Sequence, residues 1–189
     1  WWNKRMLLVE LMNSTGLIQL FEGHGKVKTT AALGEVLRAV GAGHRAAIIF
    51  FDKGGEHYSE RKSLKQLGVD WFAYGRDRIN PKTGQFDFSI TGEDRKFGQD
   101  ALGKARQLFK CDQYDLLVLD EINSSIALGI VGETDVMKLL DEKPEGLELI
   151  LTGRNATDAL KARADLVTEM RMVKHYFTSG VKAREGFDF

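Results

Sequence analysis

The chain has 189 residues, enough for one globular domain with a substantial core, and only two of them are proline. Its 27 Lys and Arg residues equal its 27 Asp and Glu residues, so no overall field draws it to nucleic acid or to an anionic membrane. The single cysteine, Cys111, excludes a disulfide within the chain and a zinc site of several cysteines, and it favours a reducing compartment such as the cytoplasm.

The first fifteen residues differ from the rest of the chain. Lys4 and Arg5 precede an apolar run, but Glu10 interrupts this run and no small-residue cleavage site follows, so it does not match a secretory signal. No stretch reaches the roughly 18 consecutive apolar residues that a membrane helix needs. We expect residues 1–15 to form an N-terminal arm or helix, residues 16–189 to form one domain, and the membrane to play no part.

From residue 16 onward, short apolar runs alternate with helix-like stretches. This alternation predicts an α/β fold with a central, mostly parallel sheet of about six strands flanked by helices. The expected strands are Leu17–Phe21, Ala46–Phe51, Val69–Tyr74, Leu116–Leu119, Leu147–Leu151 and Leu166–Met172. The expected helices are Lys28–Val40, Glu60–Leu67, Glu93–Phe109, Ser124–Leu128, Glu133–Asp141 and Ala156–Ala164. Two segments, Gly75–Ile90 and Lys174–Phe189, fit neither element and are candidates for substrate contacts.

The first expected strand leads into a loop and helix that are typical of phosphate binding. The segment reads Gly23-His24-Gly25-Lys26-Val27-Lys28-Thr29-Thr30. In such a loop, backbone N–H groups at the start of the helix face phosphate oxygens. Lys28 would neutralise the phosphates, and the hydroxyl of Thr29 would complete a Mg²⁺ shell.

Two positions depart from the pattern G-x-x-x-x-G-K-[ST], which expects glycine at 22 and 27. These positions hold Glu22 and Val27. A β-branched residue fits positive φ poorly, and strain of about 1–3 kcal/mol there would weaken nucleotide binding about tenfold or more. A plain strand–turn–helix with an exposed basic start is the alternative interpretation.

A second motif follows after two intervening strands. Leu116–Leu119 is an apolar run that ends in Asp120 and Glu121, which is the Walker B arrangement of a carboxylate near Mg²⁺ and phosphate. A buried strand that meets solvent at a polar turn would look the same. Both motifs in one α/β chain, in the usual order, favour nucleotide binding.

Beyond these motifs the chain resembles the ATP:corrinoid adenosyltransferases, which transfer the 5′-deoxyadenosyl group of ATP to the cobalt of a corrinoid. The resemblance runs from about Gly16 to Phe189, and the closing segment is its most family-specific part. That family also lacks the first glycine of the pattern. Of the two glycine positions, 22 and 27, only Val27 therefore departs from the family. The matching segments are Gly23–Ala32, Phe51–Gly54, Leu119–Glu121, Thr152–Arg154, Val173–His175 and Gly180–Phe189.

The resemblance implies a RecA-like P-loop fold in a cytoplasmic homodimer that uses ATP and Mg²⁺, with a corrinoid as substrate and a flavoprotein as a possible electron donor. A Co(I) corrinoid would displace triphosphate from C5′ of ATP, so no Ser, Cys or His nucleophile is needed. Lys28 and Glu121 would be catalytic, and Thr29, Asp120 and Glu121 would hold Mg²⁺. The triphosphate would be bound by Gly23, His24, Gly25, Lys26, Val27, Lys28, Thr29, Thr30 and Arg154.

The family uses aromatic side chains of a loop to exclude the lower ligand of cobalt. By resemblance, Phe86 and Phe88 would take this role; the alternative interpretation is that both pack on the sheet. Trp71, Phe72 and Tyr74 are the next aromatic candidates, but their place on an expected strand favours the core.

Two other functions remain open from the sequence. A RecA-like ATPase acting on a macromolecule would use Glu121 to polarise water, although the balanced charge disfavours nucleic acid. A non-catalytic relative that binds nucleotide or corrinoid would result if Val27 had damaged the phosphate site. The sequence does not choose among corrinoid acceptors and does not name the reductant.

Overall fold

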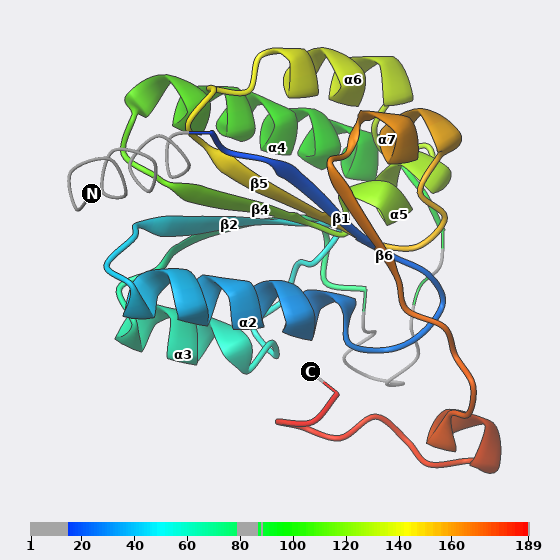
Figure 1. The fold of residues 1–189 in the computed structure, drawn as a ribbon. Helices are drawn as coiled ribbons and strands as arrows, with labels where there is room; N and C mark the ends of the chain where they lie inside the picture. The colour runs from blue at the N-terminus through cyan, green and yellow to red at the C-terminus, as the bar shows by residue number, and fades with distance from the viewer. Residues whose placement is uncertain (1–14, 79–86, 88, 189) are drawn as a thin grey trace.

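A computed structural model describes residues 15–78, 87 and 89–188 (Figure 1). Within this part of the chain, six parallel strands form one sheet in the order β3-β2-β4-β5-β1-β6. The strands are β1 (Ile18–Glu22), β2 (Ala46–Phe51), β3 (Asp70–Tyr74), β4 (Leu116–Asp120), β5 (Glu148–Thr152) and β6 (Leu166–Glu169). The helices are α2 (Lys28–Gly41), α3 (Glu60–Gln66), α4 (Gly92–Cys111), α5 (Ile122–Ala127), α6 (Glu133–Asp141), α7 (Asp158–Arg163) and the 3-10 turn η1 (Tyr176–Ser179).

The predicted α/β class, the six strands and the six helices are confirmed, and the sheet is parallel throughout. The last strand ends at Glu169, three residues before the predicted end, and the turn η1 in the tail was not expected. The order of strands places β5 between β1 and β4, which is consistent with a RecA-like P-loop domain. Among the described residues, no helix is long and apolar enough to cross a membrane.

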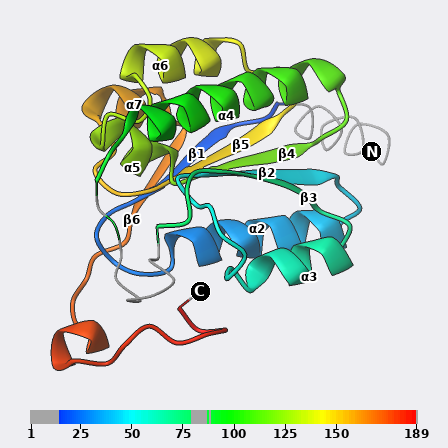
Figure 2. The same cartoon turned by 180° about the vertical axis from the view of Figure 1, so that it is seen from behind.

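Helices cover both faces of the sheet (Figures 1 and 2). α2 and α3 lie on one face, and α4, α5, α6 and α7 lie on the other. Strand side chains alternate between the two layers: Ile48 and Phe50 pack with Val36 of α2, whereas Ile49 and Phe51 pack with the α4 side. All six residues of β2 are buried, which explains why the strands read as continuous apolar runs rather than alternating ones.

The chain turns sharply directly after the first five strands. The first residue past each strand has a positive φ, a conformation that most side chains disfavour. These residues are Gly23 (φ 105°), Asp52 (φ 51°), Gly75 (φ 141°), Glu121 (φ 62°) and Gly153 (φ 134°). Because all the strands are parallel, these turns share one edge of the sheet, where open α/β proteins bind ligands.

Candidate functional site

The β1–α2 loop (Gly23–Val27) packs closely against the chain that leaves β6. The N–H of Gly25 donates to the carbonyl of Met170 at 2.6 Å. A Cβ atom at Gly23 or at Gly25 would lie 2.6 Å from that carbonyl oxygen, so only glycine fits at both positions. Glu22, where the general pattern expects glycine, is the last residue of β1 and pairs with Lys161 at 3.1 Å, so it lies outside the turn.

Val27 adopts the left-handed conformation that the sequence pattern assigns to glycine. Its φ is 83° and its ψ is 9°, and it is the N-cap residue of α2. Its carbonyl accepts the first helical hydrogen bond, from Ala31 at 2.8 Å, and its side chain is 50% exposed. The valine therefore stores backbone strain of about 1–3 kcal/mol without filling the space inside the loop.

Lys28 follows at the start of α2 and folds back over the loop. It is 6% exposed, and its Nζ donates to the carbonyl of Gly25 at 2.7 Å. Burial lowers the pKa of the Lys28 ammonium, while the nearby charges of Glu121 and Arg154 act in opposite directions. The first turn of α2 has no acidic residue and its N-cap makes no side-chain hydrogen bond, so its N–H groups are available to an anion.

Lys53 joins the two predicted motifs. Its Nζ lies 3.0 Å from Oγ1 of Thr29, 2.5 Å from Oδ2 of Asp120 and 3.9 Å from Oε1 of Glu121. Asp120 is fully buried. Burial alone would lower the pKa of the Lys53 ammonium, but the two carboxylates hold it well above its ordinary value. Lys53 is therefore the counter-charge of the buried acid.

Thr152 and Ser124 fix the two carboxylates in place. The hydroxyl of Thr152 donates to Oδ1 of Asp120 at 2.6 Å and accepts from the N–H of Glu121 at 2.9 Å. The hydroxyl of Ser124 donates to Oε2 of Glu121 at 2.5 Å and accepts from the N–H of Arg154 at 2.9 Å. Neither hydroxyl was predicted to have a role, although Thr152 stands in the family-like segment Thr152–Arg154.

The structure thus brings Lys28, Thr29, Asp120 and Glu121 together, as the sequence predicted, and adds Lys53. Arg154 is exposed at the same edge, and its charge reaches Lys28. We call this set the edge cluster, and it consists of Lys28, Thr29, Lys53, Asp120, Glu121 and Arg154. Two other predicted phosphate ligands, His24 and Thr30, are exposed beside it.

Comparison with known proteins shows which family the chain is similar to. Residues 14–189 match the model of the family described as ATP:corrinoid adenosyltransferase BtuR/CobO/CobP. A corrinoid adenosyltransferase from Sinorhizobium sp is 30% identical over 190 residues, which cover 98% of this chain and 86% of the relative. Proteins of that name from Escherichia coli (strain K12) and Salmonella typhimurium (strain LT2) are each 31% identical, with 96% of this chain and 90% of the relative covered.

The chain belongs to the ATP:corrinoid adenosyltransferase family. The resemblance seen in the sequence motifs is therefore confirmed. In this family member, the motifs that lie far apart in the sequence converge on one edge of the sheet, because each follows a parallel strand or begins the helix after one.

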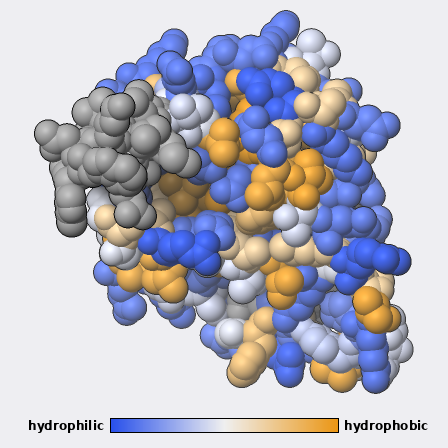
Figure 3. Space-filling model, in the orientation of Figure 1, coloured by the Kyte–Doolittle hydropathy of each residue, from blue (hydrophilic) through white to orange (hydrophobic). Residues whose placement is uncertain are grey.

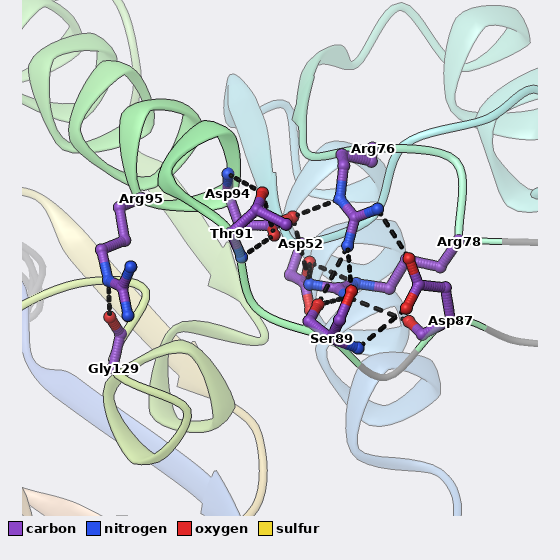
Figure 4. A network of polar contacts seen from close by, with 9 residues as sticks. All are labelled: Asp52, Arg76, Arg78, Asp87, Ser89, Thr91, Asp94, Arg95 and Gly129. Carbon is purple, nitrogen blue, oxygen red and sulfur yellow. Dashed lines mark hydrogen bonds and ion pairs between the residues drawn. The ribbon is translucent and has the colours of Figure 1, made fainter.

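Two arginines anchor the long connection between β3 and α4 of this adenosyltransferase-family chain (Figure 4). Arg78 is 5% exposed and reaches Asp52 at 2.6 Å, Asp94 at 3.2 Å and the carbonyl of Ser89 at 2.8 Å. Arg76 donates to Asp94 at 2.9 Å and to the Asp87 carboxylate at 2.8 Å. Both ends of the connection are thereby tied to the turn that carries Lys53.

The aromatic predictions have different outcomes. Phe86 and Phe88 lie outside the described residues. Phe72 and Tyr74 pack against the core on the α4 side and Trp71 packs against the core on the α2 side, which agrees with their expected place in the sheet.

The C-terminal tail, Arg171–Asp188, returns to the β1–α2 loop. Lys26, a predicted phosphate ligand, instead points to this tail: its Nζ bonds Tyr176 at 2.8 Å, the carbonyl of Phe187 at 2.6 Å and the carboxylate of Asp188. Arg184 adds a second cation, 3.1 Å from Asp188. Hydrogen bonds from Lys26 and Tyr176 hold the pKa of the Asp188 carboxyl well below its ordinary range.

The same tail exposes a series of apolar side chains. Figure 3 shows hydrophobic groups along the lower edge of the molecule, where Figure 1 places the tail. Val173 is 95% exposed, Phe177 71% and Phe187 73%. These side chains contribute little to the core of this chain.

Replacing Val27 by glycine should raise the free energy of unfolding by about 1 kcal/mol. Strain at φ 83° would be removed, and the greater flexibility of unfolded glycine offsets only part of this gain. Urea unfolding followed by circular dichroism measures the change. Val27→Ala keeps a Cβ atom and should gain less, and a Val27→Gly protein less stable than the wild type would contradict the strain.

Removing the charge of Asp188 should release the tail. Trypsin should cut Asp188→Asn at Lys182 and Arg184 about two- to fivefold faster than the wild type, as expected for loss of an exposed ion pair. Because the pKa of Asp188 is lowered, the contact persists at neutral pH and is lost only as the pH falls below the ordinary carboxyl value of about 3.9. The exposed Glu185→Gln variant is the control, and equal cleavage of both variants would show that Asp188 does not hold the tail.

Proposed function

We propose that this protein transfers the 5′-deoxyadenosyl group of ATP to the Co(I) centre of a corrinoid and releases triphosphate, in corrinoid biosynthesis or salvage. Membership of the family and the names of the similar proteins support this reaction. The structural observation that carries the proposal is the edge cluster, where Lys28, Lys53 and Arg154 outnumber the carboxylates of Asp120 and Glu121.

In this reaction the protein binds the leaving group and does not supply the nucleophile. A lone pair of Co(I) forms the bond to C5′, and the C5′–O bond breaks with its electron pair going to the triphosphate. Work left to the chain is to bind the triphosphate, to offset its growing charge and to place C5′ over cobalt. Lys28 and the N–H groups that open α2 suit the phosphates, and Arg154 supplies forked donors beside them.

The oxygen atoms of the edge cluster fit a magnesium ion. Thr29, Asp120 and Glu121 offer a hydroxyl and two carboxylates, the hard donors that Mg²⁺ prefers, and they already converge on a cation, the Lys53 ammonium. Thr152 and Ser124 orient the carboxylates from behind. When bound there, Mg²⁺ would neutralise part of the charge of the triphosphate.

Four further parts of the proposal derive from the family resemblance. We infer that the protein is located in the cytoplasm, that it forms a homodimer, that a flavoprotein is its electron donor, and that a loop carrying Phe86 and Phe88 faces the corrinoid. The exposed apolar side chains of the tail are compatible with burial against a second subunit. Arg76 and Arg78 bond described residues that follow this loop, Ser89 and Asp94.

An ATPase would need Glu121 as the group that polarises water. In this structure its carboxylate accepts a hydrogen bond from Ser124 and lies 3.9 Å from Lys53, so it is already engaged in holding the cluster. This arrangement favours a structural or metal-binding role for Glu121.

Product analysis tests the proposed reaction. The protein is incubated without oxygen with magnesium-ATP and a chemically reduced corrinoid, while the Co(I) spectrum is followed and the products are separated by chromatography. We expect adenosylcorrinoid and triphosphate in equal amounts. ADP and phosphate would indicate an ATPase, and binding without turnover would indicate a non-catalytic relative.

Lys28→Ala should weaken ATP binding about 10- to 100-fold, because a buried charged hydrogen bond contributes about 1.5–3 kcal/mol. Calorimetric titration with magnesium-ATP measures the dissociation constant. Lys62→Ala removes the same charge from the exposed face of α3 and should bind as the wild type does. An unchanged affinity in Lys28→Ala would contradict the placement of the triphosphate.

A further inference from the structure

We propose that Lys53 is a positioning residue whose ammonium competes with a divalent cation for the oxygens of Asp120 and Thr29, so that the cation enters only by displacing this ammonium. This inference rests on the proposed function and deepens it, because it states how metal and nucleotide would be coupled. Among the oxygens suited to Mg²⁺, those of Asp120 and Thr29 bond the Lys53 ammonium, and that of Glu121 lies 3.9 Å from it.

The Lys53 ammonium and a metal ion cannot share these donors. Its Nζ lies 2.5 Å from Oδ2 of Asp120 and 3.0 Å from Oγ1 of Thr29, with Glu121 at 3.9 Å. Asp120 is fully buried, and the Thr152 hydroxyl donates a hydrogen bond to its other carboxylate oxygen, Oδ1. The oxygen that faces the cluster is therefore the one that Lys53 holds.

The backbone around Lys53 is fixed, so the exchange involves the side chain alone. The N–H of Lys53 donates to Tyr74 at 3.2 Å, and its carbonyl accepts from Arg61 at 2.5 Å. Next to it, Asp52 is held by the buried Arg78, and Gly54 lies so close to Arg76 that no side chain would fit there. A lysine has four rotatable carbons between this anchor and its charge.

Other groups near Lys53 can stabilise its ammonium after it leaves Asp120. Its Nζ already lies 5.7 Å from the centre of the Phe50 ring and 5.8 Å from that of Tyr58, within the range of cation–π attraction. The phosphates bound by Lys28 would attract it further. Lys53 can thus leave Asp120 without losing all of its partners.

The charge of the edge cluster makes this exchange depend on the nucleotide. A divalent cation that entered alone would raise the local charge to five positive against two negative, counting Lys28, Lys53 and Arg154 with it. A triphosphate supplies the missing negative charge. The free protein should therefore bind divalent cations weakly and bind them well only together with ATP.

Metal binding without nucleotide tests this inference. Mn²⁺, which suits the same oxygen ligands, is titrated into the nucleotide-free protein, and the free ion is measured by electron paramagnetic resonance. We expect Lys53→Met to bind Mn²⁺ at least tenfold more tightly than the wild type. Lys62→Met, on the exposed face of α3, is the matched control and should behave as the wild type does. Equal affinity in Lys53→Met and wild type, or tight Mn²⁺ binding by the wild type, would overturn the inference.

A second measurement on the wild type covers the case in which Lys53→Met folds poorly, since Asp120 would then lack its counter-charge. The ammonium resonance of Lys53, assigned by its loss in Lys53→Arg, is followed by ¹⁵N NMR. It should shift when Mg²⁺ and ATP are added together and stay in place with Mg²⁺ alone. A resonance that does not respond to Mg²⁺ with ATP would show that Lys53 keeps its bond to Asp120.

These outcomes are separate from the test of the proposed function. The Mn²⁺ titration contains neither nucleotide nor corrinoid, so its failure removes the role of Lys53 and leaves the transferase proposal untouched. Failure to form adenosylcorrinoid would remove the transferase proposal and leave the Mn²⁺ result standing.

Discussion

The pairing of a fully buried carboxylate, Asp120, organises the carboxyl edge of the sheet. A charge out of water costs several kcal/mol unless its partners are well placed, and here they come from separate parts of the chain. Thr152 reaches it from the end of β5 and Lys53 from the turn after β2, and Lys53 also contacts Thr29 of α2. Motifs as far apart in the sequence as those of Thr29 and Thr152 are thus one structural unit. These motifs occur together because the buried charge of Asp120 requires partners from the other segments.

Backbone strain gathers around the same unit. Of the five described non-glycine residues with positive φ, four lie within the edge cluster or next to it: Val27, Asp52, Glu121 and Asn155. Such conformations persist where surrounding contacts impose them, and they concentrate at functional sites. Glu121 illustrates this, because its N–H and its carboxylate are both held by hydroxyl groups. No comparable hydrogen bonds hold the side chain of Val27. A substitution at Val27 can therefore relieve backbone strain more easily than one at Glu121.

Much of the architecture could be predicted from the sequence, because each central strand is buried on both faces and reads as a continuous apolar run. The residues of the two phosphate-type motifs could be predicted for the same reason: they follow such runs. The segment Phe51–Gly54, which holds Lys53, was among the matching segments, but the contact of Lys53 with Asp120 could not be predicted, since only the order of strands in the sheet brings the two residues together across 67 positions. The contact of Lys26 with Asp188 depends in the same way on a tail whose path the sequence does not encode locally. The strand predicted to reach Met172 ends earlier because the Met170 carbonyl bonds Gly25 in the β1–α2 loop.

The proposed function depends on the binding of a triphosphate to the edge cluster. Hydrogen exchange with and without magnesium-ATP, read by mass spectrometry, measures this most directly because it reports every segment at once. We expect slower exchange in the β1–α2 loop and the start of α2, in the turn after β2, and in the turns that carry Glu121 and Gly153, with the amino ends of the strands unchanged. Protection confined to the amino ends of the strands, or no protection at millimolar ATP, would contradict it.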